Sequence, residues 1–137
     1  MGIIYQQIRL SNFGRDDIDE IDANALVDSG AAELCIPELI VKQLKLKVLE
    51  ERKVRIANGD TVVVPYVGGV RVEVSGRQTV TSANVIGDRV LLGAIPMEAM
   101  DLIIHPRSLP LMPNPASPDM PASLAMGVLH AKRDKNA

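Results

Sequence analysis

The sequence predicts an all-β fold with one or two short helices among its strands. Short stretches of alternating apolar and polar residues are separated by turn residues along most of the chain, which is typical of β-structure. Hydrophobic residues make up 47% of the sequence and aromatic residues only 2%. The predicted core is therefore aliphatic, and its valines and isoleucines favour strands. The 137 residues suffice for one domain whose core needs no disulfide or metal to hold it.

The first strands are predicted from loose alternation and from the residues that interrupt it. Residues 2–10 form a first strand, and turn residues follow at 11–14. The acidic stretch 16–22 is expected to be a loop that leads into a second strand with a charged solvent face. This strand ends in the apolar pair Leu26-Val27 and then Asp28, as buried strands bounded by turn residues often do.

A short helix follows the apolar run 34–36. Pro37 before Glu38 is a helix-start signal, so we expect a helix from Pro37 to Leu44. Helical spacing places Leu39, Ile40 and Leu44 on its buried face.

The middle of the chain is predicted to be a series of hairpins. Asn58-Gly59-Asp60 is a strong hairpin signal, with Pro65 ending the pairing and Gly68-Gly69 forming a break. The elements expected after this break are strands at 70–74 and 78–85, an apolar strand ending at Gly93, a second helix within 94–100 that includes Pro96 to Met100, a strand at 101–105, a turn at 106–108 and an extended segment at 109–111.

The C-terminal part differs in composition. Four prolines between 113 and 121 lie among Asn, Ser and Asp residues, which is typical of linkers. We therefore expect a folded domain at 1–113 and a Pro-rich linker with a mobile tail at 114–137. One or two helical turns could form within 122–131.

Composition excludes several classes of partner. The net charge of −2 and the scarcity of aromatic side chains give neither attraction to phosphate backbones nor stacking platforms, so no nucleic acid partner is expected. No signal peptide and no apolar run of about 18 residues is found, so no membrane association is expected. The single cysteine, Cys35, predicts a cytoplasmic location and reads as a buried core thiol. With only His105 and His130, no metal or other cofactor is predicted.

Asp28 is the candidate functional residue. Burying an ionised carboxylate costs roughly several kcal/mol unless it is hydrogen-bonded, shares a proton with another group or becomes neutral. Asp28 nevertheless follows directly after a run of residues predicted to be buried. Gly30 lets the backbone turn or approach another group closely. Asp28-Ser29-Gly30 could also be an ordinary turn, or a phosphodegron-like signal before Glu33. The apolar flanks at 25–27 and 34–36 argue against the exposed loop that such a signal requires.

The order of these motifs resembles the retropepsin-type aspartic proteases, single-domain enzymes that include retroviral proteases and small bacterial homologues. Leu26-Val27-Asp28-Ser29-Gly30-Ala31 matches their first motif, and Leu91-Leu92-Gly93 before a helix matches their second. A hairpin lies between the two, and the resemblance covers about residues 3–113. It implies a closed acid-protease β-barrel.

The resemblance also implies a mechanism and a set of site residues. One chain carries a single Asp-Ser-Gly, so a homodimer would place two Asp28 carboxylates together, and they would share a proton and activate a water. Ser29 would brace the pair across the dimer, and Gly30 and Ala31 would leave room for the peptide substrate. The hairpin at 54–64 would be a flap that closes over the peptide. The remaining expected substrate contacts are the tip of this flap and the second motif, at Ala57, Asn58, Gly59, Asp60, Leu92 and Gly93.

Two departures from the family pattern keep alternatives open. Retroviral members have an arginine soon after the second glycine that helps lock the dimer, whereas this chain has Ala94. The flap is framed by Arg55 and Asp60 rather than being rich in glycine. The sequence is therefore also compatible with a catalytically inactive binding module of the same fold, or with an unrelated β-domain in which Asp28 merely forms a turn.

Overall fold

The computed structural model describes residues 3–105 and 111–127. The elements within these ranges are β1 (Ile4–Asn12), β2 (Ile21–Val27), β3 (Leu34–Ile36), α1 (Glu38–Leu44), β4 (Lys47–Arg55), β5 (Thr61–Val74), β6 (Arg77–Val85), β7 (Leu91–Leu92), α2 (Ala94–Ala99), β8 (Leu102–Ile104) and β9 (Leu111–Pro113). The predicted turn at 106–108, the residues just after it and the end of the tail at 128–137 lie outside the described residues.

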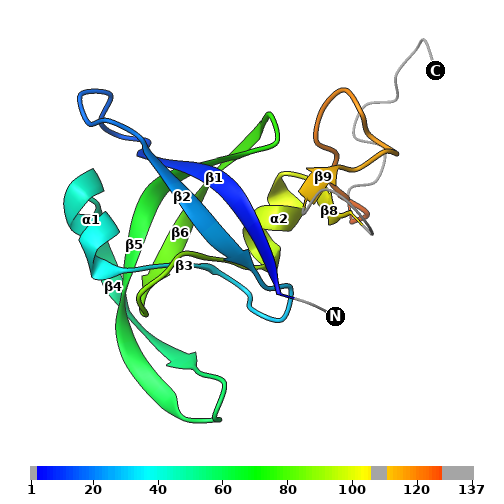
Figure 1. The fold of residues 1–137 in the computed structure, drawn as a ribbon. Helices are drawn as coiled ribbons and strands as arrows, with labels where there is room; N and C mark the ends of the chain where they lie inside the picture. The colour runs from blue at the N-terminus through cyan, green and yellow to red at the C-terminus, as the bar shows by residue number, and fades with distance from the viewer. Residues whose placement is uncertain (1–2, 106–110, 128–137) are drawn as a thin grey trace.

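Six strands close into a barrel in the order β1-β2-β7-β3-β6-β5. The closure is made by β1, which pairs with β2 along residues 4–10 and with β5 at residues 9–12. Strand β4 pairs with β5 and extends from the barrel as one arm of a long hairpin (Figure 1). The all-β barrel with two short helices that the sequence predicts is confirmed.

The barrel interior is aliphatic, as the composition predicts. The larger side chains that are fully enclosed include Leu10, Leu34, Ile36, Leu44, Leu92 and Met100. Both apolar runs beside Asp28 contribute to this core, since Val27 and Leu34 belong to the same buried cluster. The loop that carries Asp28 is thus anchored at both ends by buried strands.

Strand β5 differs from its prediction at two places. Pro65 does not end the pairing, because it lies opposite Glu51 of β4 while β6 begins to pair with β5 only at Tyr66. On that one-sided stretch a missing N–H is tolerated. Gly68 and Gly69 do not break the strand. They form a bulge, with Gly69 at φ +73°, and this bulge transfers β5 from the hairpin to the barrel.

Helix α1 also corrects one predicted core position. Leu39 is 65% exposed, whereas Ile40, Val41 and Leu44 pack against the core. A seven-residue helix has room for one narrow buried stripe, and Leu39 falls beside it. The helix begins at Glu38, because Pro37 keeps an extended conformation at its N-cap.

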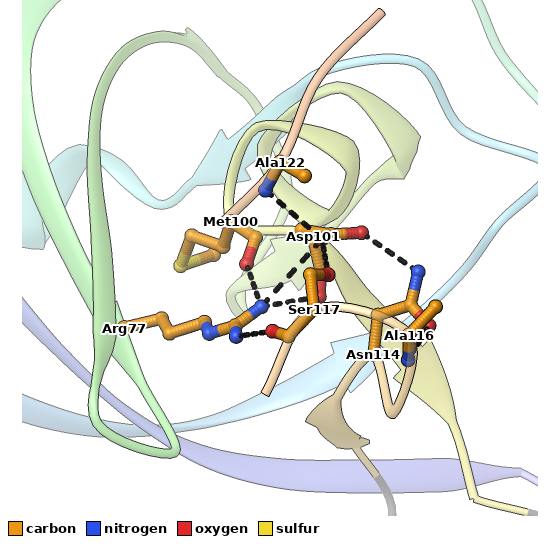
Figure 2. A network of polar contacts seen from close by, with 7 residues as sticks. All are labelled: Arg77, Met100, Asp101, Asn114, Ala116, Ser117 and Ala122. Atoms are coloured by element: carbon orange, nitrogen blue, oxygen red, sulfur yellow. Dashed lines mark hydrogen bonds and ion pairs between the residues drawn. The ribbon is translucent and has the colours of Figure 1, made fainter. Parts of the chain in front are cut away.

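After β8 and β9, which pair with each other, residues 114–122 fold back on the barrel; we call them the C-terminal strap. The carboxylate of Asp101 accepts hydrogen bonds from the Asn114 side chain at 3.1 Å, the Ala122 N–H at 3.0 Å and the Ser117 hydroxyl (Figure 2). These bonds lower the pKa of Asp101, the Ser117 hydroxyl contributing most.

Arg77 completes the attachment of the strap. Its side chain is 6% exposed, lies 3.8 Å from the Asp101 carboxylate and donates to the backbone carbonyl oxygens of Met100, Asp101 and Ser117 (Figure 2). A buried guanidinium needs this many acceptors to offset its lost hydration. The first part of the segment expected to be a linker is therefore attached to the barrel by a buried polar network.

Candidate active site

The site is built where β2 ends. Strand β7 lies between β2, to which it is parallel, and β3, to which it is antiparallel. The chain leaves β2 at Asp28, loops over residues 28–33 and returns as β3. The Asp28 N–H donates to the Leu92 carbonyl at 3.0 Å, which fixes the backbone of Asp28 to the middle strand.

The carboxylate of Asp28 is oriented by its own loop. Its Oδ1 accepts the Gly30 N–H at 2.9 Å, and the Asp28 carbonyl accepts the Ala31 N–H at 3.1 Å. The turn that the sequence allowed as an alternative is therefore present, and it holds the carboxylate in place. Asp28 is half-buried, while Ser29 and Gly30 are exposed.

The second motif fastens this loop. A Cβ at Gly93 would lie 2.3 Å from the Glu33 carbonyl oxygen and 2.8 Å from that of Ala31, so only glycine fits. The next two residues donate backbone hydrogen bonds to the same loop, Ala94 to Ala31 and Ile95 to Ala32, both at 2.8 Å. The Asp28 motif and the Gly93 motif, about 65 residues apart in sequence, are thus joined by backbone hydrogen bonds. The parallel pairing of β2 with β7 lies directly before both motifs.

An open cleft of about 830 Å³ lies beside Asp28. Its walls come from the loop after β2, from β4 and the start of its hairpin turn at residues 52–57, and from the loop at residues 86–89. Of the residues predicted to form the site, Asp28, Gly30, Ala31 and Ala57 line this cleft.

The other predicted residues lie elsewhere in this chain. Ser29 is exposed outside the cleft, and Asn58, Gly59 and Asp60 form the exposed tip of the hairpin. Leu92 and Gly93 are buried beneath the loop, because β7 turns its alternate residue, Leu91, toward the cleft.

The hairpin of β4 and β5 has the form expected of a flap. Gly59 donates to the Ile56 carbonyl and Ile56 to the Asp60 carbonyl, both at 2.9 Å, and Gly59 has φ +91°. The Asn58 side chain accepts the Asp60 N–H at 2.9 Å. This tight turn ends a two-stranded arm whose β4 is exposed over almost its whole length.

Contacts at the base of the hairpin connect it to the Asp28 loop. The Tyr66 hydroxyl lies 3.3 Å and 3.4 Å from the two carboxylate oxygens of Glu33. The Arg52 guanidinium stacks 3.8 Å from the centre of the Tyr66 ring and pairs with Glu50 at 2.7 Å. A stacked guanidinium is attracted by the ring, so β4, β5 and the loop are coupled.

The cleft residues that sequence reasoning missed include Cys35, Asn84 and Leu91, which the barrel brings together. Cys35 was expected in the core, but it is half-buried and faces the cleft, because its neighbours Leu34 and Ile36 occupy the core face. Burial raises the pKa of its thiol. The strict alternation of faces along residues 34–36 was the signal in the sequence that could have placed Cys35 on the face opposite Leu34 and Ile36.

Within the described residues, no group of three or more His, Cys, Asp or Glu side chains is placed to hold a metal ion. Across the same ranges, no helix combines the length and the apolar character that crossing a membrane requires.

Comparison with known proteins gives one sequence family and two structural relatives. A family model described as aspartyl protease matches residues 17–114, and no match was found among curated proteins. The solution structure of the simian foamy virus (mac) protease is 16% identical, with a TM-score of 0.49, covering 68% of this chain and 90% of that one. The foamy viral protease-reverse transcriptase, solved in complex with an RNA/DNA hybrid, is 17% identical, with a TM-score of 0.52, covering 69% of this chain and 11% of that one.

Proposed function

The chain belongs to the aspartyl protease family and has the retropepsin-like fold. From this premise we propose that it is an endopeptidase, active as a homodimer, in which two Asp28 carboxylates activate a water that attacks the peptide bond. The observation that carries the proposal is the position of Asp28, which lies at the end of β2, is held by the Leu92 carbonyl and the Gly30 N–H, and lines a cleft beneath a hairpin.

The dimer supplies what one chain lacks. Acid proteolysis of this type needs two carboxylates in contact, and an isologous interface brings each Asp28 to its symmetry mate. Their mutual repulsion keeps one proton on the pair, so the ionised member takes a proton from water while the protonated member donates to the scissile carbonyl. The exposure of Ser29 and Gly30 and of Ile95, 46% exposed beside the loop, fits a surface that a second subunit would cover.

The remaining predicted residues have roles that follow from their positions. Ser29 would brace the pair across the dimer, and Gly30 and Ala31 would admit the substrate backbone. The hairpin tip at residues 57–60 would close over the peptide. Leu92 and Gly93 would act from beneath the loop, by holding its backbone rather than by contacting substrate.

The proposal is tested by cleavage of a peptide library derived from a proteome, with products identified by mass spectrometry between pH 4 and pH 7. Asp28→Asn keeps the size of the side chain and removes both acid and base from the dimer, so cleavage should fall to background. General acid–base catalysis alone contributes about 10²- to 10⁴-fold in rate. The matched control, Asp19→Asn, changes an exposed residue of the 16–20 loop and should cleave as the wild type does.

Cleavage by purified Asp28→Asn at the wild-type rate would disprove the proposal. One observation favours the inactive binding module as the second candidate: Ala94 replaces the arginine that helps lock retroviral dimers. A wild-type protein that binds peptides as a monomer, without cleaving them at any concentration, would establish that alternative.

A further inference from the structure

Four residues on neighbouring strands form a row on the face of the barrel wall that is turned away from the core. Cys35 of β3 is paired in register with Leu91 of β7 on one side and with Asn84 of β6 on the other. Asn84 is in turn paired with Tyr66 of β5. The first three line the cleft beside Asp28, and Tyr66 contacts Glu33, another residue of its wall.

Asn84 is the unusual member of this row. It is 7% exposed, and its Oδ1 has no hydrogen-bond partner among the residues that the structure describes. Buried polar atoms are nearly always hydrogen-bonded, and one that is not calls for an explanation such as a bound water or ligand. The Asn84 side chain also interacts with the Cys35 thiol, and this interaction opposes the burial that raises the pKa of the thiol.

We propose that Asn84 is a specificity-determining residue, and that its Oδ1 accepts a hydrogen bond from an uncharged amide or hydroxyl side chain of the peptide. This inference rests on the proposed function, since it assigns a substrate side chain to the same cleft. The row explains why the acceptor is available: Leu91 has no donor, the Cys35 thiol is only a weak one, and Asn84 lines the cleft that a peptide would enter.

The cleft carries charges of both signs and therefore has no single preference for a charged side chain. Arg52, Lys53, Arg55 and Arg89 line it together with Asp28, Glu33 and Asp88. A cation would meet the Arg52 guanidinium, which is held over Tyr66 and paired with Glu50. An anion would meet the carboxylates of Glu33 and Asp28, which line the same cleft. A neutral donor avoids both repulsions and loses less hydration on entering the cleft. A site that hydrogen-bonds a substrate donor rejects the analogue without it far more strongly than an apolar pocket rejects a size variant.

The test uses peptide pairs that differ only in one near-isosteric side chain, Asn against Leu and Gln against Met, at each position around a cleavage site. The wild-type protein should prefer the amide at one position. In Asn84→Leu the ratio of the two kcat/KM values should fall at that position by about tenfold or more. The matched control Asn24→Leu, at an exposed site on β2, should leave the ratio unchanged.

A second variant keeps the test decisive if Asn84→Leu does not fold. Asn84→Asp retains an acceptor of the same size and adds a negative charge, so it should shift the preference at the same position toward lysine or arginine. Thermal unfolding supplies a further readout: if Oδ1 has no protein partner, Asn84→Leu should unfold at or above the wild-type temperature. A structural asparagine would make it less stable.

The two proposals fail in distinguishable ways. If cleavage depends on Asp28 but the amide preference is absent, or survives Asn84→Leu, the subsite is disproved and the protease stands. If the wild type cleaves nothing, the same peptide pairs are titrated by fluorescence anisotropy against the wild type and Asn84→Leu. A preference for the amide-bearing peptide that Asn84→Leu abolishes would support the subsite, and equal or absent binding would overturn it.

Discussion

Gly93 is the residue on which the geometry of the site depends most directly. Its backbone lies directly against that of the Asp28 loop, and an added Cβ would meet three backbone atoms at 2.3 to 2.8 Å. Backbone cannot yield as a flexible side chain does, so Gly93→Ala should cost about 3 kcal/mol in the free energy of unfolding. It should also displace the loop and reduce peptide cleavage at temperatures where the protein remains folded.

The control for that change is Gly14→Ala. There the nearest atom to an added Cβ is the Asn12 side-chain oxygen at 3.6 Å, an ordinary contact. Urea unfolding followed by circular dichroism measures both variants. Equal stability of the two would show that the close approach at Gly93 can relax.

The lowered pKa of Asp101 leads us to expect that the stability of the protein depends on pH. This pKa is lowered in the folded protein by the Ser117 hydroxyl, the Ala122 N–H and Asn114, and more weakly by Arg77. A lowered folded-state pKa gives stability that is present above the unfolded-state pKa, about 3.9, and is lost as the pH falls through the folded-state value. The difference in unfolding free energy between the wild type and Asp101→Asn should therefore shrink below about pH 4. A difference that stays constant from pH 6 to pH 3 would contradict this.

The role of a single residue could be predicted from the sequence where its surroundings are formed by its neighbours in the chain. Asp28 stands out because the apolar run before it and the glycine after it are local. The position of Asn84 was not predictable, because its environment comes from β3, β5 and β6 together. Cys35 lies between these cases: alternation indicated its face, but only the barrel shows that this face is the cleft.

At the scale of elements, the hairpin tip gives a prediction about the flap. Gly59 has φ +91°, and no atom lies within 4 Å of an added Cβ, so Gly59→Ala introduces conformational strain without a clash. That strain is worth about 1 kcal/mol and falls on an arm whose β4 is mostly exposed. The melting temperature should change little, whereas kcat/KM for peptides should fall several-fold because the tip no longer holds its closing turn.

Gly127→Ala is the matched control, since an added Cβ there also meets open space and its φ is not positive. It should leave both the melting temperature and kcat/KM unchanged. Full activity of Gly59→Ala would argue against a role for the tip in closing over substrate.

Most element types and boundaries followed from turn residues and periodicity, and the exceptions have a common cause. Pro65 and Gly68-Gly69 stop an isolated strand, but β5 changes partners there, from β4 on one side to β1 and β6 farther along. A bulge suits such a change of partner. The sequence alone does not state which strands are neighbours, so it could not distinguish a bend from an end.

At the scale of the whole molecule, the C-terminal strap is attached to the barrel by the polar network of Asp101 and Arg77. A domain at 1–113 and a tail at 114–137 remain predictions, and the network around Asp101 makes part of them testable. Arg77→Met keeps an unbranched apolar stem but removes the guanidinium that donates to Met100, Asp101 and Ser117. We expect the loss of about 3 kcal/mol of stability and faster amide exchange in residues 114–122, measured by hydrogen exchange and mass spectrometry.

An exposed arginine provides the comparison for this variant. Arg15→Met removes an ion pair with Asp17 in which both side chains are about half exposed or more, and such pairs contribute about 1 kcal/mol or less. Unchanged exchange of residues 114–122 in Arg77→Met would show that the strap is held by other contacts.

The proposed dimer makes the last prediction, which separates a shared catalytic pair from two independent sites. When wild type and Asp28→Asn subunits are mixed in equal amounts and allowed to exchange, random pairing leaves about a quarter of the dimers with two wild-type subunits. If the pair acts as a unit, a mixed dimer has one carboxylate and does not cleave, so activity per wild-type subunit should fall to about half. An equal amount of Asp19→Asn, which keeps Asp28, should leave the activity per Asp28-bearing subunit unchanged. Activity per wild-type subunit that is indifferent to added Asp28→Asn, at concentrations where sedimentation shows dimers, would mean that each chain cleaves alone.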